Sequence, residues 1–531
     1  MWWRVTIGVA AVAIVAGVAG PPHQARTPAP RPNILFILSD DLDADELAFM
    51  PKLKASLADE GTSFANYFVS VSLCCPSRST TLRGQYSHNT GVKTNSGGNG
   101  GFETAYASGL EKSTIATWLQ AAGYRTALYG KYLNGYPRTA SARYVPPGWT
   151  DWASAVVGNA YSEYNYTLNE NGRAVRYGAN APDYGTDVYA RKAAAFIRSS
   201  AAAQAPFFIY LAVYAPHAPA TPAPRHAGLF ADARAPRTPS YDEADVSDKP
   251  AYIRNRPRIR PAAQAAIDAL YRKRLQSLQA VDEAVAGLID TLRVAGQLAN
   301  TYIVFASDNG FHQGQHRLVT GKQTAYEEDI RVPLVVRGPG VPKGRVVQQF
   351  AGNVDLAPTF AEIGGATAPA FVDGRSLLPL LSATGAANAS WRNVYLVEHW
   401  NAGPADADST REPLDPDQIA GSSQRGERGQ RGRGGRAGRA GRAGRAGRAG
   451  RGGAQAIGPV AIPEYHALRT AQYSYVEYVT GERELYDLAR DPNELTSIAA
   501  SASKSLLDGL AGQLKQLVTC AAAKCREAES R

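Results

Sequence analysis

Apolar and polar positions alternate along the chain in blocks that predict β-strands followed by α-helices. Residues 33–38 read Asn-Ile-Leu-Phe-Ile-Leu, a run that predicts a strand buried on both faces. The same pattern predicts a fold of the α/β class, with a mostly parallel central sheet and helices on both faces. The further predicted strands cover 124–129, 207–213, 301–306 and 333–336, and the helices cover 113–122, 187–203 and about 262–294.

The pattern changes toward the C-terminus. Residues 471–479 alternate as a half-buried strand does, and leucines at helical spacing predict a helix over 506–517. We therefore expect a large domain over 31–385 and a smaller α+β domain over 390–531. The chain of 531 residues, 44% of them hydrophobic, is long enough for both cores.

Polar clusters directly follow four of the predicted strands. In open α/β sheets, ligands bind beyond the carboxyl ends of the strands, so side chains in these positions converge. We expect one site to be formed by the clusters, which are Ser39-Asp40-Asp41, Gly130-Lys131, Pro216-His217 and Ser307-Asp308-Asn309-Gly310.

The first 22 residues are typical of an export signal. Arg4 precedes an uncharged apolar run from Val5 to Val18, and small residues with two prolines follow. The run is short for a membrane span and favours a signal peptide, with an uncleaved signal anchor as the alternative. The sequence thus predicts an exported protein, whether periplasmic, on the cell surface or secreted.

The net charge of +10 belongs mainly to one low-complexity segment at 421–453. Ten arginines and one glutamate lie between Arg425 and Arg451, so the rest of the chain is close to neutral. The composition predicts a disordered insert within the smaller domain. An alternative role is a polycationic tether for an anionic polymer. Nucleic-acid binding is not expected, because no RNA-binding fold accompanies the arginines and the chain carries an export signal.

Four cysteines occur in two pairs. Cys520 and Cys525 are close enough in sequence to form a local disulfide in an exported protein. Cys74 and Cys75 are adjacent, and neighbouring cysteines rarely pair with each other because the geometry is strained. If the C-terminal pair forms a disulfide, two thiols remain without an explanation.

Acidic and basic groups at the strand ends predict a metal-assisted site for an oxyanion. Adjacent carboxylates repel each other unless a cation lies between them. Oxygen ligands from Asp40, Asp41, Asp308 and Asn309 suit a hard cation, Ca²⁺ above Mg²⁺. The expected partners of an anionic tetrahedral substrate, sulfate or phosphate, are the side chains of Arg78, Lys131, His217 and Lys322.

The segment Cys74-Cys75-Pro76-Ser77-Arg78 resembles the Cys-x-Pro-Ser-Arg signature of the sulfatase family. The segments at 32–41, 123–131, 215–219, 307–310 and 353–359 also resemble family motifs in order and spacing. Within the family, the motifs look most similar to N-acetylglucosamine-6-sulfatases and extracellular heparan sulfatases. One departure is Arg83, where many members have threonine; we expect its charge near the site entrance.

The resemblance implies that Cys74 is oxidised to formylglycine (3-oxoalanine) by a formylglycine-generating enzyme and also ligates the metal. The aldehyde hydrate would attack sulfur, with Asp308 helping to deprotonate it. Arg78 and Lys131 would hold the hydrate and the sulfate, while His217 and Lys322 stabilise or protonate the leaving oxygen. The expected substrate is a sulfated carbohydrate or an aryl sulfate. Cys75 is expected to pack beside the nucleophile as a small buried hydrophobe.

Two other functions fit the same residues. A phosphoester or phosphonate monoester hydrolase of the same superfamily would need a similar oxyanion site. A protein without catalysis could hold sulfated glycans, with an unmodified Cys74.

Overall fold

The computed structural model describes residues 1–4, 8, 31–382, 391–401 and 462–530. The chain separates into two compact units, Met1–Pro30 and Arg31–Arg531. Most of the predicted signal peptide at 1–22 and all of the arginine-rich insert at 421–453 lie outside the described residues. Across the described part, no helix combines the length and apolar character required to cross a membrane.

A ten-stranded sheet forms the centre of the larger unit, and its middle is parallel. β1 (Asn33–Asp40) pairs in parallel with β8 (Phe207–Pro216) on one side and with β9 (Thr301–Ser307) on the other. Beyond β8, β4 (Arg125–Gly130) and β5 (Asp151–Gly158) continue the parallel order. These strands confirm the predicted mostly parallel sheet.

Toward both edges the sheet includes antiparallel pairs, which the sequence pattern did not predict. β10 (Leu334–Arg337) is antiparallel to β9 and to β2 (Thr62–Phe64). At the other edge, β6 (Tyr166–Glu170) and β7 (Arg173–Tyr177) fold back on β5 as a meander. The full strand order is β11-β2-β10-β9-β1-β8-β4-β5-β6-β7, with β11 at Arg345–Val347.

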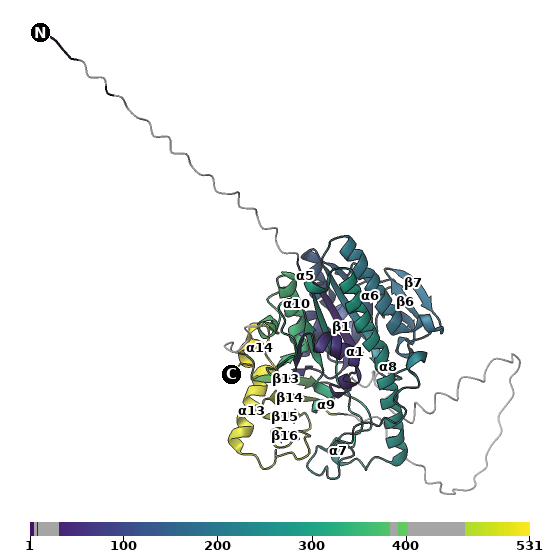
Figure 1. The fold of residues 1–531 in the computed structure, drawn as a ribbon. Helices are drawn as coiled ribbons and strands as arrows, with labels where there is room; N and C mark the ends of the chain where they lie inside the picture. Colours follow the sequence, from purple (N-terminus) through teal and green to yellow (C-terminus); the bar gives the residue numbers. More distant parts are fainter. Residues whose placement is uncertain (5–7, 9–30, 383–390, 402–461, 531) are drawn as a thin grey trace, which may run out of the picture. The chain divides into compact units, whose positions relative to one another are not determined.

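Helices cover both faces of this sheet (Figure 1). Because alternate side chains of a strand point to opposite faces, Phe36 and Leu38 pack in one core and Leu35 and Ile37 in the other. The first core lies against α2 (Cys74–Arg83), α5 (Ile115–Ala121) and α10 (Leu356–Gly364). The second core lies against α1 (Pro51–Leu53), α6 (Gly185–Ala202) and α8 (Pro261–Val294).

A separate four-stranded antiparallel sheet forms near the C-terminus, in the order β13-β14-β15-β16. Its strands are Val394–His399, Tyr465–Thr470, Tyr473–Tyr478 and Arg483–Asp487. The amphipathic helix α13 (Lys504–Leu517) packs on this sheet through Leu510, Leu514 and Leu517. The predicted α+β character of this region is confirmed, while the proposed domain limits of 31–385 and 390–531 stay a prediction.

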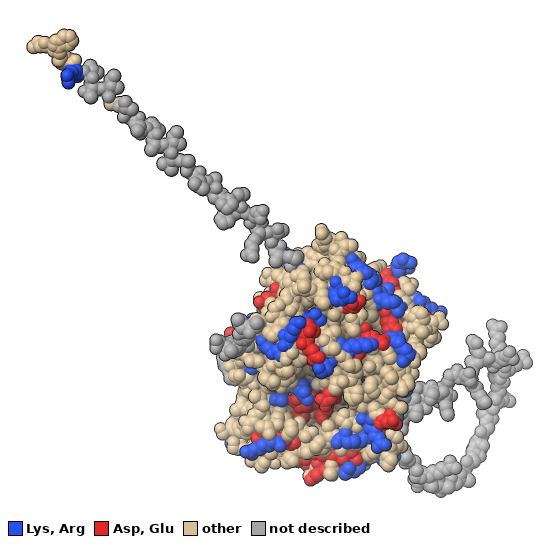
Figure 2. Space-filling model, viewed as in Figure 1, with Lys and Arg blue, Asp and Glu red and all other residues tan. Residues whose placement is uncertain are grey.

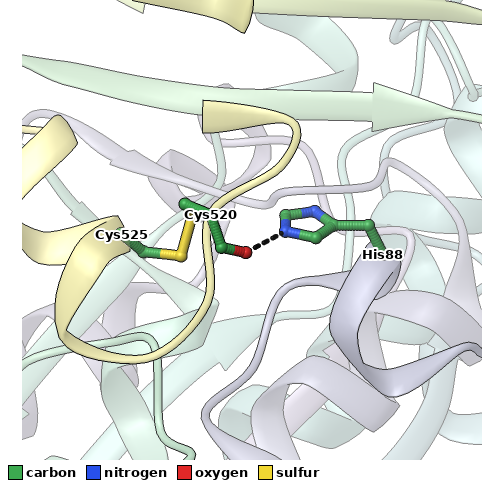
Figure 3. Close-up of side chains that lie close together, drawn as sticks. All are labelled: His88, Cys520 and Cys525. Atoms are coloured by element: carbon green, nitrogen blue, oxygen red, sulfur yellow. Dashed lines mark hydrogen bonds between the residues drawn. A yellow bond between two sulfur atoms is a disulfide. The ribbon is translucent and has the colours of Figure 1, made fainter. Parts of the chain in front are cut away.

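The last residues contact the rest of the chain through buried ion pairs and a hydrogen bond, and a local disulfide closes a short loop within them. Arg392 is fully buried and pairs with Asp355 and with Glu529. Cys520 and Cys525 form the predicted disulfide, and the carbonyl oxygen of Cys520 lies 2.9 Å from Nε2 of His88 (Figure 3). The C-terminal segment is therefore anchored to the short helix that carries His88.

The remaining short elements connect these layers. They are β3 (Tyr67–Phe68), β12 (Ala351–Gly352), α3 (Ser87–Thr90), α4 (Gly101–Ala107), α7 (Ala251–Arg254), α9 (Glu327–Ile330), α11 (Leu378–Leu381) and α14 (Ala523–Ala528). On the face shown in Figure 2, positive and negative side chains are interspersed. This mixture agrees with a nearly neutral body outside the arginine-rich insert.

Candidate active site

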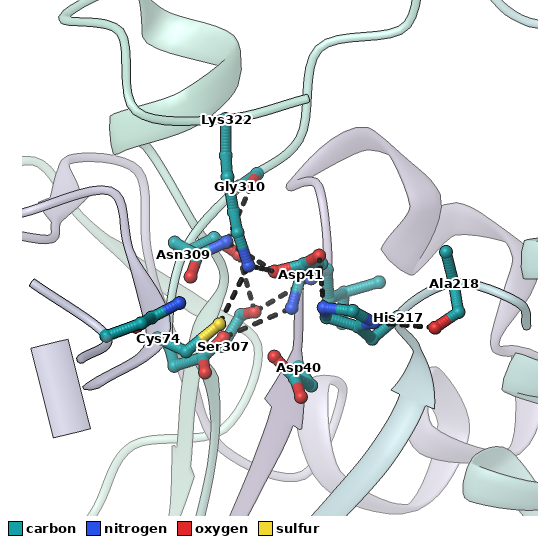
Figure 4. Close-up of polar contacts among 12 residues, drawn as sticks. Asp40, Asp41, Cys74, His217, Ala218, Ser307, Asn309, Gly310 and Lys322 are labelled. Atoms are coloured by element: carbon teal, nitrogen blue, oxygen red, sulfur yellow. Dashed lines mark hydrogen bonds and ion pairs between the residues drawn. The ribbon is translucent and has the colours of Figure 1, made fainter. Parts of the chain in front are cut away.

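The carboxyl ends of four adjacent parallel strands meet at one buried polar cluster (Figure 4). β1 ends at Asp40, β9 leads into Asp308, β4 leads into Lys131 and β8 leads into His217. These side chains are 0–3% exposed, although they are charged or polar. The predicted convergence is confirmed, because parallel neighbours end at the same edge of the sheet.

Cys74 enters this cluster from the first turn of α2. It is the first residue of the helix and is fully buried. The N-cap residue Leu73 makes no side-chain capping bond, but the N–H of Cys75 donates to Oδ1 of Asn95 and that of Ser77 to the carbonyl of Leu73, so the helix contributes chiefly the positive end of its dipole. Pro76 is tolerated here because the first turn needs no intrahelical N–H bond. This geometry favours an anion or a developing negative charge at position 74.

Arg78 follows Cys74 by four residues and therefore lies on the same face of α2. Its Nε donates to Oδ2 of Asp308 at 2.8 Å, and its Nη1 donates to the carbonyl of Lys131 at 3.0 Å. Nη2 lies 3.8 Å from Oδ2 of Asp40. One guanidinium thus connects three of the four strand ends, which a point charge such as lysine does not do.

Lys322 comes from the loop between β9 and α9 and reaches the same place. Its Nζ donates to Sγ of Cys74 and to Oδ1 of Asp41, both at 2.7 Å. Two bonds hold the adjacent backbone: the Ser72 hydroxyl donates to the carbonyl of Thr324, and the Tyr465 hydroxyl donates to that of Gln323. Tyr465 belongs to β14, so the C-terminal sheet helps to place Lys322.

Asp41 contacts several other residues of the cluster. Its Oδ1 also accepts from Nδ2 of Asn309 at 2.7 Å, and its backbone N–H donates to Oδ1 of Asp308 at 3.1 Å. Nε2 of His217 lies 3.5 Å from Oδ2 of Asp41. Nδ1 of His217 lies 2.7 Å from the carbonyl of Ala218, an acceptor, so the proton of the neutral ring belongs on Nδ1. The structure brings all nine predicted site residues together.

The charges in this buried cluster shift the pKa values of its carboxylates in opposite directions. Burial alone raises the pKa of Asp40, but Lys131, His217 and Arg78 outweigh it and hold that pKa below its ordinary value. Burial and the charge of Asp40 raise the pKa of Asp308 to about 6, which Arg78 only partly offsets. The pair therefore titrates together, with Asp40 as the carboxylate that stays ionised.

The donor set fits a divalent cation. Within this cluster, one carboxylate or amide oxygen of each of three predicted ligands is buried and has no hydrogen-bond partner among the described residues: Asp40 Oδ1, Asp41 Oδ2 and Asn309 Oδ1. Potential ligand atoms of Asp40, Asp41, Cys74 and His217 all lie within 4.8 Å of one another. Leaving buried carboxylate oxygens without a partner is costly, and a cation removes that cost. Both oxygens of Asp308 are already hydrogen-bond acceptors, from Arg78 and from Asp41, so its place in the ligand set stays a prediction.

The expected position of Arg83 is wrong. Arg83 is the last residue of α2, at the opposite end of the helix from Cys74. Its Nη1 donates to the carbonyls of Leu110 and Ser113, and its guanidinium lies 3.9 Å from the ring centroid of Phe371. Ten helical residues separate the two ends by roughly 15 Å. The Arg83 side chain therefore packs at the C-terminal end of α2, away from the site.

The sequence analysis did not identify Tyr161 as a neighbour of the site. It also did not identify the backbone hydrogen bond of Cys75. The ring of Tyr161 lies 4.5 Å from that of His217, and Nζ of Lys131 lies 5.0 Å from the Tyr161 centroid. Tyr161 follows β5, an unpredicted strand that carries no recognisable motif, so a single sequence offers no signal for it. Cys75 packs in the core as expected, and burial raises the pKa of its thiol to about 12. Its backbone N–H donates to Asn95.

The chain belongs to the sulfatase family. Residues 32–366, which include every residue of the cluster, match the profile of the Sulfatase family. It is 33% identical to human N-acetylglucosamine-6-sulfatase over 93% of this chain and 86% of that protein. It is 32% identical to an arylsulfatase of Volvox carteri over 99% of this chain and 79% of that protein.

Higher identity occurs with longer relatives. An extracellular sulfatase (SULF-1 homolog) of Drosophila melanogaster is 40% identical over 69% of this chain, which corresponds to 33% of that protein. A putative extracellular sulfatase of Caenorhabditis elegans is 39% identical over 69% of this chain and 52% of its own length. The match thus spans about a third to a half of these two relatives.

Solved structures share the fold at lower identity. One, a protein in complex with its substrate D-glucosamine-2-N,6-O-disulfate, has a TM-score of 0.68 and 23% identity, covering 92% of this chain and 97% of that one. A phosphonate monoester hydrolase from Silicibacter pomeroyi has a TM-score of 0.61 and 22% identity, covering 92% and 94%. Both confirm the α/β fold.

Proposed function

We propose that this protein is a sulfuric ester hydrolase whose nucleophile is a formylglycine formed from Cys74. The observation that carries the proposal is the position of Cys74, in the first turn of α2 and 2.7 Å from the ammonium group of Lys322. Asp40 and Asp41, each with one carboxylate oxygen that lacks a hydrogen-bond partner in the described part of the chain, lie in the same cluster. Membership of the sulfatase family supports the same chemistry.

A divalent cation, Ca²⁺ in preference to Mg²⁺, would be held by Asp40, Asp41, Asp308, Asn309 and the side chain at position 74. When bound, it supplies positive charge that favours the ionised nucleophile and the sulfate oxygens. The all-oxygen set favours a hard cation once the thiol has been replaced. His217 lies close enough to be an additional ligand, in which case its role as an acid would pass to Lys322.

The first half of the reaction forms a sulfate ester on residue 74. The aldehyde there is hydrated to two hydroxyl groups, one of which loses its proton and attacks sulfur. Asp308 is the proposed proton acceptor because burial and Asp40 raise its pKa to about 6, closer to neutrality than that of an exposed aspartate. Arg78 and Lys131 neutralise the sulfate oxygens while the bond between sulfur and the leaving oxygen breaks.

The leaving oxygen needs a proton, and Lys322 and His217 are placed to provide it. Lys322 carries donor protons 2.7 Å from the atom at position 74. In the second half of the reaction, the remaining hydroxyl loses its proton, the carbon–oxygen bond to sulfate breaks, and the aldehyde is restored. An unmodified thiol has no second hydroxyl and cannot complete this cycle.

We infer that the substrate is a sulfated carbohydrate, with the 6-sulfate of an N-acetylglucosamine unit as the first choice. The support is the human relative named N-acetylglucosamine-6-sulfatase, matched over 93% of this chain. Extracellular sulfatases among the relatives support an exported protein that acts on glycosaminoglycans. The modification requires a formylglycine-generating enzyme as a partner. Contact between the arginine-rich insert and anionic polymers stays a prediction.

The proposal is tested by comparing turnover of nitrophenyl sulfate and nitrophenyl phosphate by the full-length protein, co-expressed with a formylglycine-generating enzyme. We expect the sulfate ester to be hydrolysed with the larger kcat/KM. N-acetylglucosamine 6-sulfate and an N-sulfated glucosamine without a 6-sulfate then test the position of the ester. A larger kcat/KM for the phosphate ester would favour the phosphoester or phosphonate hydrolase instead.

The matched control is Cys75→Ala, which removes a thiol beside the nucleophile but leaves position 74 intact. Cys74→Ala should lose turnover, whereas Cys75→Ala should keep it at a level set by folding. Equal loss in both variants, with both folded, would mean that position 74 has no special role. Binding of heparin by Cys74→Ala without turnover by any form of the protein would favour the non-catalytic glycan-binding function.

A further inference from the structure

A second group of metal-ligand side chains lies outside the cluster described above. Ligand atoms of His316, Glu328 and Glu494 lie within 4.8 Å of one another. His316 belongs to the loop after β9, Glu328 to α9 and Glu494 to the segment after β16. Three segments far apart in sequence therefore meet at this group.

Two atoms in this group are buried and lack a hydrogen-bond partner among the described residues. They are Nε2 of His316 and Oε1 of Glu494, whose side chains belong to residues only 1% exposed. Buried polar atoms without partners are rare in folded proteins, and each calls for an ion or a water molecule. The atoms are an imidazole nitrogen and a carboxylate oxygen, both good ligands for a divalent metal.

The other edge of the His316 ring fixes its tautomer. Nδ1 lies 2.8 Å from Oε2 of Glu243, and the ring stacks on Tyr326 with centroids 3.9 Å apart. A carboxylate can only accept, so the proton belongs on Nδ1 and the lone pair is on Nε2. A carboxylate behind a histidine in this way orients the ring and raises its strength as a metal ligand.

The charges around the group favour a divalent cation. The buried Nζ of Lys249 lies 3.7 Å from Oε1 of Glu243 and donates to the backbone carbonyl of Glu494. The carboxylates of Glu328 and Glu494 belong to the group itself, and a divalent cation would neutralise them when they are ionised.

We propose that His316, Glu328 and Glu494 form a structural Zn²⁺ site that joins the loop carrying Lys322 to the C-terminal segment. One imidazole and two carboxylates suit Zn²⁺ better than Ca²⁺, which prefers oxygen ligands alone. Bonds of about 2.1 Å place the ligands of one Zn²⁺ roughly 3–4 Å apart, so movements of about 1 Å close the site. Glu328 is partly exposed and marks the side from which an ion enters.

The proposed zinc site would restrain the loop that also carries Lys322, but it shares no ligand with the proposed cation site beside Cys74. His316 and Lys322 lie in one loop, which is closed on itself by the β-bridge between His312 and Gly321. Holding His316 to Glu494 would limit the movement of this loop. The expected effect is on thermal stability, independent of whether position 74 is modified.

The experiment uses the full-length protein with Asp40→Asn and Asp41→Asn, which disable the proposed cation site next to Cys74. The protein is stripped with a chelator, exposed to Zn²⁺ and desalted, and its zinc content and Tm are measured. We expect close to one zinc per chain and a higher Tm with Zn²⁺. Adding Glu494→Gln, which keeps the shape but weakens the ligand, should remove both the zinc and the rise in Tm.

Glu482→Gln is the matched control, because it lies in the same C-terminal region and pairs with Arg254 instead. It should keep both the zinc and the rise in Tm. If Glu494→Gln fails to fold, the same two measurements on Glu328→Gln, at the partly exposed ligand, test the proposal instead. Zinc content well below one per chain in the background, or unchanged by these substitutions, would overturn the proposal. Neither readout uses sulfate-ester turnover, so the two proposals fail separately.

Discussion

Nζ of Lys322 lies 2.7 Å from Sγ of Cys74 and, at the same distance, from Oδ1 of Asp41. The ammonium group therefore connects the residue at the start of α2 with the carboxylate after β1. Any group that replaces the thiol at position 74 meets this cation. We propose two tasks for Lys322 from this arrangement, to stabilise charge at position 74 and to donate a proton to the departing oxygen.

Replacing Lys322 should therefore affect catalysis more than folding. Lys322→Met keeps most of the aliphatic volume but removes the charge and the proton. We expect kcat for nitrophenyl sulfate to fall by about 10²–10⁴-fold, the usual contribution of a general acid. We expect the change in KM to be smaller than the change in kcat. Lys343→Met, at an exposed lysine that pairs with Glu60, is the control and should keep wild-type kinetics.

Arg78→Lys tests whether the shape of the guanidinium matters. Lysine keeps the charge but cannot contact Asp308 and the carbonyl of Lys131 together. We expect kcat/KM to fall by about 10²–10³-fold. We also expect the free energy of unfolding in urea to fall by about 1–3 kcal/mol, since a buried acceptor loses its donor. Kinetics close to wild type would show that a point charge is sufficient.

Metal removal should destabilise the protein as well as inactivate it. A ligand that binds only the folded state raises its stability with concentration, so Tm should rise with added Ca²⁺. Asp41→Asn should weaken that rise, because Oδ2 of Asp41 is one of the buried oxygens without a hydrogen-bond partner. The check is a series of thermal melts at increasing Ca²⁺ and, separately, Mg²⁺. An equal response in wild type and Asp41→Asn would place the ion elsewhere.

Glu163 should make stability depend on pH. It is buried and accepts from the backbone N–H of Thr186 at 2.7 Å, and burial raises its pKa from 4.5 to about 8. The folded state thus holds a proton that the unfolded state releases above pH 4.5. This contribution is complete below about pH 4.5, falls as pH rises, and levels off above about pH 8.

Denaturant unfolding of wild type and Glu163→Gln across that pH range is the check. Glutamine has the same shape and cannot ionise, so the variant should lose part of the decline in stability. Glu362→Gln, at an exposed position, should keep the wild-type decline. A decline of equal size in wild type and in Glu163→Gln would contradict the assignment.

Much of the fold and part of the site could be predicted from the local pattern of apolar and polar residues. Because β1 is buried on both faces, its apolar run is continuous and the following Asp40 and Asp41 mark the strand end. The i,i+4 spacing of Cys74 and Arg78 places both on one face of α2, although the sequence pattern did not predict this helix. Six of the nine site residues were accessible as strand ends, whereas Cys74, Arg78 and Lys322 were recognised through the resemblance to family motifs.

The rest depends on contacts between distant segments. Arg83 and Arg78 look alike in sequence, but one lies at the far end of α2 and packs on Phe371, while the other reaches Asp308. Tyr161 comes to His217 because it follows β5, a strand parallel to β4 that the sequence pattern did not predict. The meeting of His316 with Glu494 spans more than a hundred residues and has no local signal. Hydrophobic periodicity carries no information about such pairs.

The central claim is that position 74 acts as an aldehyde, and mass spectrometry of the peptide that contains it is the most direct test. Protein should be taken from its native host or co-expressed with a formylglycine-generating enzyme, and its turnover of nitrophenyl sulfate measured on the same sample. The account predicts a residue lighter by the replacement of CH₂–SH with CHO, with activity in proportion to the converted fraction. An intact thiol at position 74 in protein with full sulfate-ester turnover would contradict it.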